Sequence, residues 1–167
     1  SDVENLTLTG SGNINATGNS LNNTLRGNSR NNTLFGEDGT DTLYGNDGND
    51  TLNGGNNNDH LYGGNGNDTL NGGNDLDTMV GGAGDDIYIV NHVNDVVTEI
   101  SSEGTDLIQS SVSYTASSDV ENLTLTGSGN INATGNSLDN SLSGNNGSNT
   151  LIGNAGNDTL SGSGGAD

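Results

Sequence analysis

Residues 36–89 divide into six consecutive nine-residue units, which read GEDGTDTLY, GNDGNDTLN, GGNNNDHLY, GGNGNDTLN, GGNDLDTMV and GGAGDDIYI. Every unit has glycine at its first place and aspartate at its sixth. The eighth place holds one larger apolar residue, namely Leu43, Leu52, Leu61, Leu70, Met79 and Tyr88. A repeat of fixed length decides the architecture, because each unit buries its apolar residue against its neighbours.

The composition excludes an ordinary globular core. The 167 residues include 29 glycines, no proline and no cysteine, only 26% are hydrophobic, and the formal net charge is -20. Such a composition is typical of disordered chains, which have too little apolar surface to offset chain entropy. The nine-residue phase argues against disorder here, since a solenoid needs only one inward apolar residue per half-coil.

The charge also limits the partners. Arg26 and Arg30 are the only basic residues besides two histidines, so nucleic acid or an anionic membrane surface would be repelled. No apolar run is long enough to insert into a membrane. The partner that this composition predicts is a cation.

The nine-residue pattern predicts the coil. The first six residues of a unit are rich in glycine and form a turn, and the last three form a short strand whose eighth side chain points inward. Two units then make one coil of 18 residues. We therefore predict an all-β chain, a right-handed parallel β-solenoid of the β-roll type.

A longer repeat is superimposed on the short one. Residues 1–21 recur unchanged at 118–138, which gives a period of 117 residues, or thirteen nines. Because thirteen is odd, the two copies should place their acidic edges on opposite sides. We divide the chain into three parts: a β-roll at 1–89, β-rich connecting rungs at 90–126, and the next repeat at 127–167. Within the first part, Asn-type coils occupy 9–35 and acidic units occupy 36–89. A separate β-subdomain is the alternative for 90–126.

Four units keep the frame but have asparagine at the sixth place: Asn23, Asn32, Asn140 and Asn149. Stacked asparagines can form ladders of amide hydrogen bonds. We expect such ladders in these coils, in place of bound metal.

The aspartates should form two columns, because coils stack units that lie two apart. One column holds Asp41, Asp59 and Asp77, with Asp95 as a further candidate member, and the other holds Asp50, Asp68 and Asp86. Neighbouring strands are about 4.7–4.9 Å apart. At an effective dielectric constant near 20, two carboxylates at that distance repel by roughly 3–4 kcal/mol. The columns therefore require a compensating charge.

Calcium fits this requirement best, since it binds six to eight carboxylate and carbonyl oxygens, whereas magnesium retains water and zinc prefers Cys or His. We predict several Ca²⁺ ions. The predicted carboxylate ligands are Asp41, Asp50, Asp59, Asp68, Asp77, Asp86, Asp158 and Asp167. The predicted carbonyl ligands include those of Gly45, Gly48, Gly54, Gly63, Gly66, Gly72, Gly81 and Gly84. The alternative is that Asp serves only as a turn former.

The units GGNGNDTLN and GGAGDDIYI resemble the GGxGxDxUx nonapeptide of the RTX, or haemolysin-type calcium-binding, repeat family. This resemblance implies a parallel β-roll with calcium between its turns. It also implies bacterial type I secretion of an unfolded chain, which folds when it meets extracellular calcium. The motif matches residues 36–89 strongly and 153–167 in part, whereas the Asn units and residues 90–126 depart from it.

These features favour a non-enzymatic, secreted or cell-surface calcium-binding segment, which serves as a rigid spacer or building block of an adhesin, surface layer or filament. Its open ends would allow end-to-end assembly. The alternatives are a recognition module for polysaccharide or ice and an accessory repeat of a secreted enzyme. His60 and His92 lie too far apart to suggest a catalytic site of their own.

Overall fold

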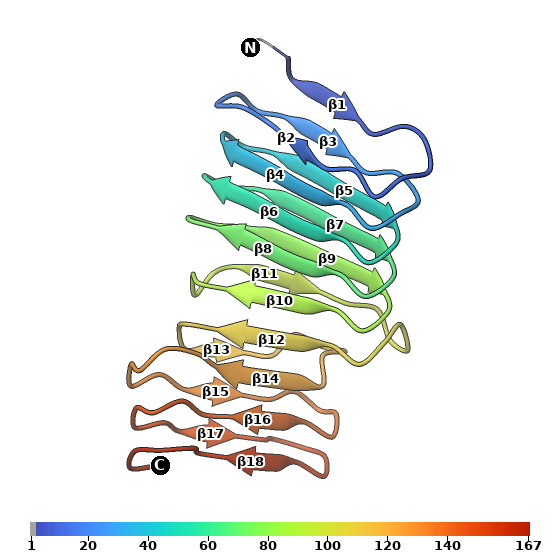
Figure 1. The fold of residues 1–167 in the computed structure, drawn as a ribbon. Coiled ribbons are helices and arrows are strands. Elements are labelled where there is room, and N and C mark those ends of the chain that lie inside the picture. The colour runs from blue at the N-terminus through green and yellow to red at the C-terminus, as the bar shows by residue number, and fades with distance from the viewer. Residues whose placement is uncertain (1–2) are drawn as a thin grey trace.

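The computed structural model describes residues 3–167 as a stack of coils built from parallel strands (Figure 1). About nine turns of 18 residues follow one another, and no helix occurs in the described residues, so none of their segments is a candidate membrane-spanning helix. The prediction of an all-β parallel solenoid is confirmed. Strands on the two faces of the stack run in opposite directions, because each coil passes along one face and returns along the other (Figure 1).

Three sheets line the faces of the solenoid. The six-stranded sheet contains β1 (Asn5–Thr7), β3 (Thr24–Arg26), β5 (Thr42–Asp47), β7 (His60–Asn65), β9 (Thr78–Ala83) and β11 (Val96–Thr98). The nine-stranded sheet contains β2 (Ala16–Thr17), β4 (Thr33–Asp38), β6 (Thr51–Asn56), β8 (Thr69–Gly73), β10 (Ile87–Val90), β12 (Leu107–Ser110), β14 (Asn122–Leu125), β16 (Ser141–Ser143) and β18 (Thr159–Ser161). The three-stranded sheet contains β13 (Tyr114–Thr115), β15 (Ala133–Thr134) and β17 (Leu151–Ile152).

The eighth-place residues form the core. They stand over one another in register, as Leu43 pairs with Leu61 and Leu61 with Met79 on one face. The eighth-place residues from Leu25 to Tyr88 are fully or almost fully buried, and the inner side chains of later coils extend the same thin column as far as Leu142, whereas Leu160 near the end of the stack is exposed. The buried set is Leu25, Leu34, Leu43, Leu52, Leu61, Leu70, Met79, Tyr88, Val97, Ile108, Leu123 and Leu142.

The strands of the acidic units are longer than predicted. Instead of three residues, β5 spans six, because pairing continues through the first three places of the next unit. Asn46 pairs with Gly64 and Asp47 with Asn65, beyond the residues expected to form the strand. The extra pairing uses the N–H groups of the turn in the sheet ladder, with consequences for the aspartates.

Residues 90–126 contribute strands to the same stack, but with irregular coil lengths. Ile87 pairs with Leu107, which lies twenty residues later, and Leu107 pairs with Asn122, fifteen residues later. Asn122 pairs in turn with Ser141. These three coils together take 54 residues, as three regular coils would, so the phase of the solenoid is restored.

The odd number of half-coils has the predicted effect. The segment that begins with Asn5 forms β1 of the six-stranded sheet, whereas the identical segment at Asn122 forms β14 of the nine-stranded sheet. The two copies of the 117-residue repeat therefore lie on opposite faces.

Candidate metal centre

The sixth-place aspartates lie at the two edges of the flattened coil, immediately before the strands that line each face. All six sixth-place aspartates of residues 36–89 are buried, with at most 2% of the residue surface exposed. Adjacent members of a column are joined through the backbone. The N–H of Asp41 donates to Oδ1 of Asp59 at 2.7 Å, and the N–H of Asp59 donates to Oδ1 of Asp77 at 2.9 Å. The predicted columns are thus present in the structure.

The second carboxylate oxygen of each aspartate has no such donor. Oδ2 is buried and accepts no hydrogen bond in Asp41, Asp50, Asp59, Asp68, Asp77 and Asp86. Leaving a buried charged oxygen unpaired costs more than an ordinary lost hydrogen bond. The repetition of the same unpaired atom in six successive units indicates a missing partner of positive charge.

The first-place glycines leave room for that partner. A Cβ added to Gly54 would meet both Oδ2 of Asp59 and the carbonyl oxygen of Gly72. We call this space a cradle. It is bounded by a first-place glycine, by Oδ2 of the aspartate in the same unit, and by the carbonyl of the first-place glycine two units later. The same arrangement occurs at Gly36, Gly45 and Gly63, where the carbonyls come from Gly54, Gly63 and Gly81.

The other predicted carbonyls lie elsewhere. The carbonyl of Gly45 faces the Asn-type turn at Gly27, beside Oδ1 of Asn32. The fourth-place carbonyls of Gly48 and Gly66 lie against the fourth-place glycines of the next coil, and that of Gly84 lies against Gly104. The carbonyls that lie beside the unpaired oxygens at Gly36, Gly45, Gly54 and Gly63 are those of first-place glycines.

The electrostatics agree with an uncompensated site. Burial raises the pKa of Asp59 to about 7 in spite of the hydrogen bond from Asp41, and the charges of Asp41 and Asp77 raise it further. The same causes raise the pKa of Asp68 and Asp86 to about 7 and that of Asp77 to about 6. The two arginines are engaged elsewhere, Arg26 over the ring of Tyr44 at 3.9 Å and Arg30 with the carbonyl of Ser11 at 3.4 Å.

In the Asn-type turns the oxygen and the nitrogen of the sixth-place side chain are both hydrogen-bonded to protein groups, so these turns need no cation. Oδ1 of Asn32 accepts the N–H of Asn28 at 2.8 Å, and its Nδ2 donates to the carbonyl of Ile14 at 2.7 Å. Oδ1 of Asn149 likewise accepts the N–H of Asn145, and its Nδ2 donates to the carbonyl of Ile131. The expected amide ladders between these asparagines are therefore wrong, because their amides bond to the backbone and within their own turn.

The backbone distinguishes the two turn types at the second place. In acidic units this residue has a positive φ, for example 82° at Glu37 and 79° at Asn46. Asn19, Asn28, Asn136 and Asn145, at the second place of the Asn-type turns, do not adopt it. Asparagine thus occupies both conformations, so the second residue does not choose between them. Positive φ accompanies aspartate at the sixth place, including at Asn154 in the Asp158 unit.

Three further predicted ligands differ from the regular six. Oδ2 of Asp95 accepts the N–H groups of Asn91 and His92 at 3.2 and 3.0 Å, so this side chain caps its own turn. Asp158 and Asp167 accept the N–H groups of Asn140 and Asn149 and approach their own first-place glycines, Gly153 and Gly162. Asp158 is half-buried and Asp167 exposed.

Two acidic residues that the sequence analysis did not predict as ligands lie beside Asp86, at the end of the column that contains Asp50 and Asp68. Glu99 and Asp106 each place a carboxylate oxygen within 4.8 Å of Asp86, and all three residues are buried. Glu99 could have been found by continuing the nine-residue count, because it lies 18 residues after Gly81, at a first place where a regular unit has glycine. Asp106 was not predicted as a ligand because its coil is two residues longer than a regular one.

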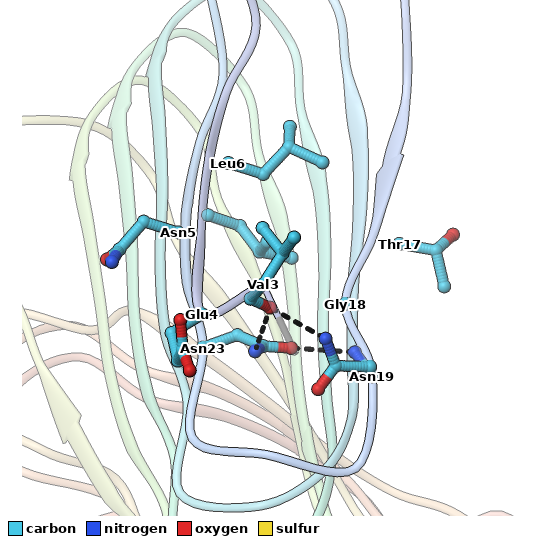
Figure 2. A pocket seen from close by; sticks show the side chains of 9 residues that line it. Val3, Glu4, Asn5, Leu6, Thr17, Gly18, Asn19 and Asn23 are labelled. Carbon is cyan, nitrogen blue, oxygen red and sulfur yellow. Dashed lines mark hydrogen bonds between the residues drawn. The ribbon is translucent and has the colours of Figure 1, made fainter. Parts of the chain in front are cut away.

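A pocket at the N-terminal end of the stack is of a different kind. It is lined by Val3–Leu6, Thr17–Asn19, Asn23 and Leu25 (Figure 2). Its amides are engaged, since Nδ2 of Asn19 and Nδ2 of Asn23 both donate to the carbonyl of Val3, at 2.7 and 3.4 Å. It brings together no set of unpaired polar groups like that in the acidic turns.

Comparison with known families agrees with this geometry. None of the curated proteins compared with the chain matches it. The model of the RTX calcium-binding nonapeptide repeat, four copies long, matches residues 17–52, 53–88 and 134–167, which together make up more than half of the chain. Repeats of this family bind calcium in a β-solenoid, the fold and the chemistry to which the unpaired Oδ2 atoms point. The chain therefore belongs to the RTX calcium-binding nonapeptide repeat family.

Proposed function

We propose that this chain is an extracellular structural segment that folds when it binds calcium and then serves as a rigid spacer or building block of a secreted adhesin, surface layer or filament. One observation carries the proposal. Six buried Oδ2 atoms in a row lack any hydrogen-bond donor, and each faces the space beside a first-place glycine.

In this proposal, the carboxylates of Asp41, Asp50, Asp59, Asp68, Asp77 and Asp86 hold Ca²⁺ together with first-place glycine carbonyls. The Asp158 and Asp167 units have the same motif and would hold further ions. Calcium supplies positive charge to columns that otherwise repel. Binding is thereby coupled to folding, since the sites exist only when coils are stacked.

The coupling suits a chain that is secreted unfolded. In a cytosol poor in calcium the repulsion within each column opposes stacking, and millimolar calcium outside the cell removes it. Type I secretion and a cell-surface or extracellular location are parts of this proposal, as is the absence of catalysis. The Asn-type turns support it indirectly, because they close their coils with amides and leave metal binding to the acidic units.

The test is circular dichroism of the whole chain with excess chelator and with millimolar calcium. We expect a disordered spectrum in chelator and a β spectrum in calcium, reversible on adding chelator again. Equal β content in both conditions would contradict calcium-driven folding. Isothermal titration calorimetry on the same samples gives the number of ions.

The alternative, a recognition module, predicts binding to a glycan array or thermal hysteresis in ice. The outward aromatic side chains do not favour it. Tyr44 and Tyr62 stack with their ring centroids 5.0 Å apart, and Arg26 covers the other side of Tyr44. A ring that is covered on both faces has no face left for a sugar.

A further inference from the structure

The last regular turn of the acidic block ends against a residue that breaks the repeat. In regular cradles a neutral glycine carbonyl from the next coil lies beside the aspartate Oδ2, as the carbonyl of Gly81 lies near Asp68. Eighteen residues after Gly81, the position of the next first-place glycine is occupied by Glu99. A carboxylate side chain thus stands where the pattern has a glycine.

The side chain of Glu99 points into the coil, toward Gly81, and not toward solvent. Only 7% of the residue surface is exposed, and Tyr88, a core residue, donates its hydroxyl hydrogen bond to Oε1. A Cβ added to Gly81 would meet Oε1 of Glu99, the hydroxyl of Tyr88 and Oδ2 of Asp86 together. In this cradle the oxygen of the Glu99 carboxylate therefore replaces the glycine carbonyl.

Asp106 completes the group from the following coil. The N–H of Asp86 donates to Oδ1 of Asp106 at 2.8 Å, so Asp106 continues the column in spite of the longer coil. One oxygen from each of the three carboxylates lies within 4.8 Å of the others. All three residues are more than nine-tenths buried.

Two of the oxygens have no partner. Oδ2 of Asp86 and Oε2 of Glu99 are buried and accept no hydrogen bond. Burial, together with the charges of Asp106 and Asp86, raises the pKa of Glu99 to about 8. Three carboxylates packed without a cation are costly, and a divalent or trivalent ion bound by oxygen would compensate them.

We propose that Asp86, Glu99 and Asp106 form a carboxylate-rich metal site for a hard cation such as Ca²⁺, which closes the acidic block and differs from the repeat cradles in having Glu99 in place of a glycine carbonyl. Its Asp86 ligand is shared with the proposed function, but the other two lie outside the nonapeptides. With three carboxylates, this site binds more tightly than a cradle.

Tyr88 provides a specific probe. Terbium(III) takes the same oxygen ligands as calcium, and its luminescence is excited through a nearby tyrosine. The hydroxyl of Tyr88 contacts the cluster, whereas Tyr44 and Tyr62 stack on an outward face. The first terbium ion bound by the 167-residue chain should therefore emit when tyrosine is excited. Tyr88→Phe should remove that early emission, and Tyr44→Phe should retain it.

Affinity is tested with Glu99→Gln, which keeps the shape and removes one charge. We expect the tightest terbium site to weaken by about tenfold or more, because carboxylate number sets affinity in oxygen-ligand sites. The control Glu4→Gln removes the same charge from an exposed residue at the N-terminal end of the stack (Figure 1) and should match the unmodified chain. Circular dichroism at saturating calcium confirms that each variant is folded.

Two results would overturn the proposal: unchanged tight binding in Glu99→Gln, as expected if Glu99 is simply a protonated core residue, or early emission that persists in Tyr88→Phe. These results are distinguishable from failure of the proposed function. If calcium folds the chain but Glu99→Gln binds as before, only this site is refuted. If calcium does not change the fold, the proposed function fails, and the terbium measurement still reports on the three carboxylates.

Discussion

Replacing Asp59 by asparagine should change stability in opposite directions with and without calcium. Asp59 lies in the middle of its column, with Asp41 before it and Asp77 after it. Asparagine keeps an oxygen to accept the N–H of Asp41. Its amide nitrogen takes the place of Oδ2 and can donate to the carbonyl of Gly72, which lies beside the same cradle.

The size of the effect follows from the spacing of the column. At a strand separation of about 4.8 Å and an effective dielectric constant near 20, each neighbouring pair of carboxylates repels by about 3.5 kcal/mol. Asp59 has two such neighbours, but protonation at its raised pKa of about 7 limits the cost of its charge, so Asp59→Asn relieves at most about 4 kcal/mol in the calcium-free fold at pH 7. In calcium the variant loses an ion instead, which costs about 2.7 kcal/mol when free calcium is 100 times the dissociation constant.

The assay is urea unfolding in millimolar calcium, paired with folding by trimethylamine N-oxide in chelator, since this osmolyte favours the compact state without supplying charge. The variant should unfold at lower urea in calcium and fold at lower osmolyte in chelator. The control is Asp75→Asn, which removes an exposed charge at a place where Asn57 already stands with the same φ of 75°. If Asp59→Asn and Asp75→Asn behave alike in both assays, Oδ2 is not a ligand and the column is not under repulsion.

Three further predictions use the same full-length chain. Leu61→Ala should lower the unfolding free energy in calcium by about 2–5 kcal/mol in a urea titration, because Leu61 is fully buried, whereas Leu76→Ala, at a residue 41% exposed, should cost less than about 1 kcal/mol. Gly54→Ala should reduce the number of calcium ions counted by calorimetry, because its Cβ fills a cradle; Gly12→Ala, where the Cβ meets only the Ile14 methyl at 3.8 Å, should leave the count unchanged. Without calcium, acid should favour the fold: the raised pKa values mean that the folded chain binds more protons than the unfolded chain, so stability rises as pH falls from about 7 toward the ordinary aspartate pKa of 3.8. Circular dichroism in chelator at decreasing pH checks this, and a loss of β signal over that range would contradict it.

The sequence predicts most of the fold, because the nine-residue phase depends on residue types that act locally. Glycine at the first place and an apolar residue at the eighth define the half-coil, and equal unit length brings Asp41, Asp59 and Asp77 into one column. The length of the strands was not predictable in the same way. Pairing through Asn46 and Asp47 depends on the positive φ of the second residue, which asparagine adopts in one turn type and avoids in the other.

The candidate site was predictable where the period holds and not where it fails. The coil from Ile87 to Leu107 has two extra residues, so counting by nines does not bring Asp106 beside Asp86. Glu99 keeps the count but has the wrong residue type for a turn, and its role follows only from the packing of Tyr88 against it. Distances between side chains of different coils decide such a site, and no local pattern encodes them.

The two turn types solve one physical problem in two ways. Each turn has a buried side-chain oxygen at the sixth place that requires a partner. The two turn types differ in the direction of the N–H group of the second residue. In the Asn28 turn this N–H reaches the sixth side chain, so the oxygen is satisfied permanently. In the Asn46 turn the backbone continues the sheet ladder, and Oδ2 of Asp50 is left without a hydrogen-bond donor. Because the 117-residue repeat spans an odd number of half-coils, equivalent strands of the two copies lie on opposite faces. Within residues 36–89 the unpaired Oδ2 atoms already lie in both columns, so a cation that pairs them acts on both edges of the coil.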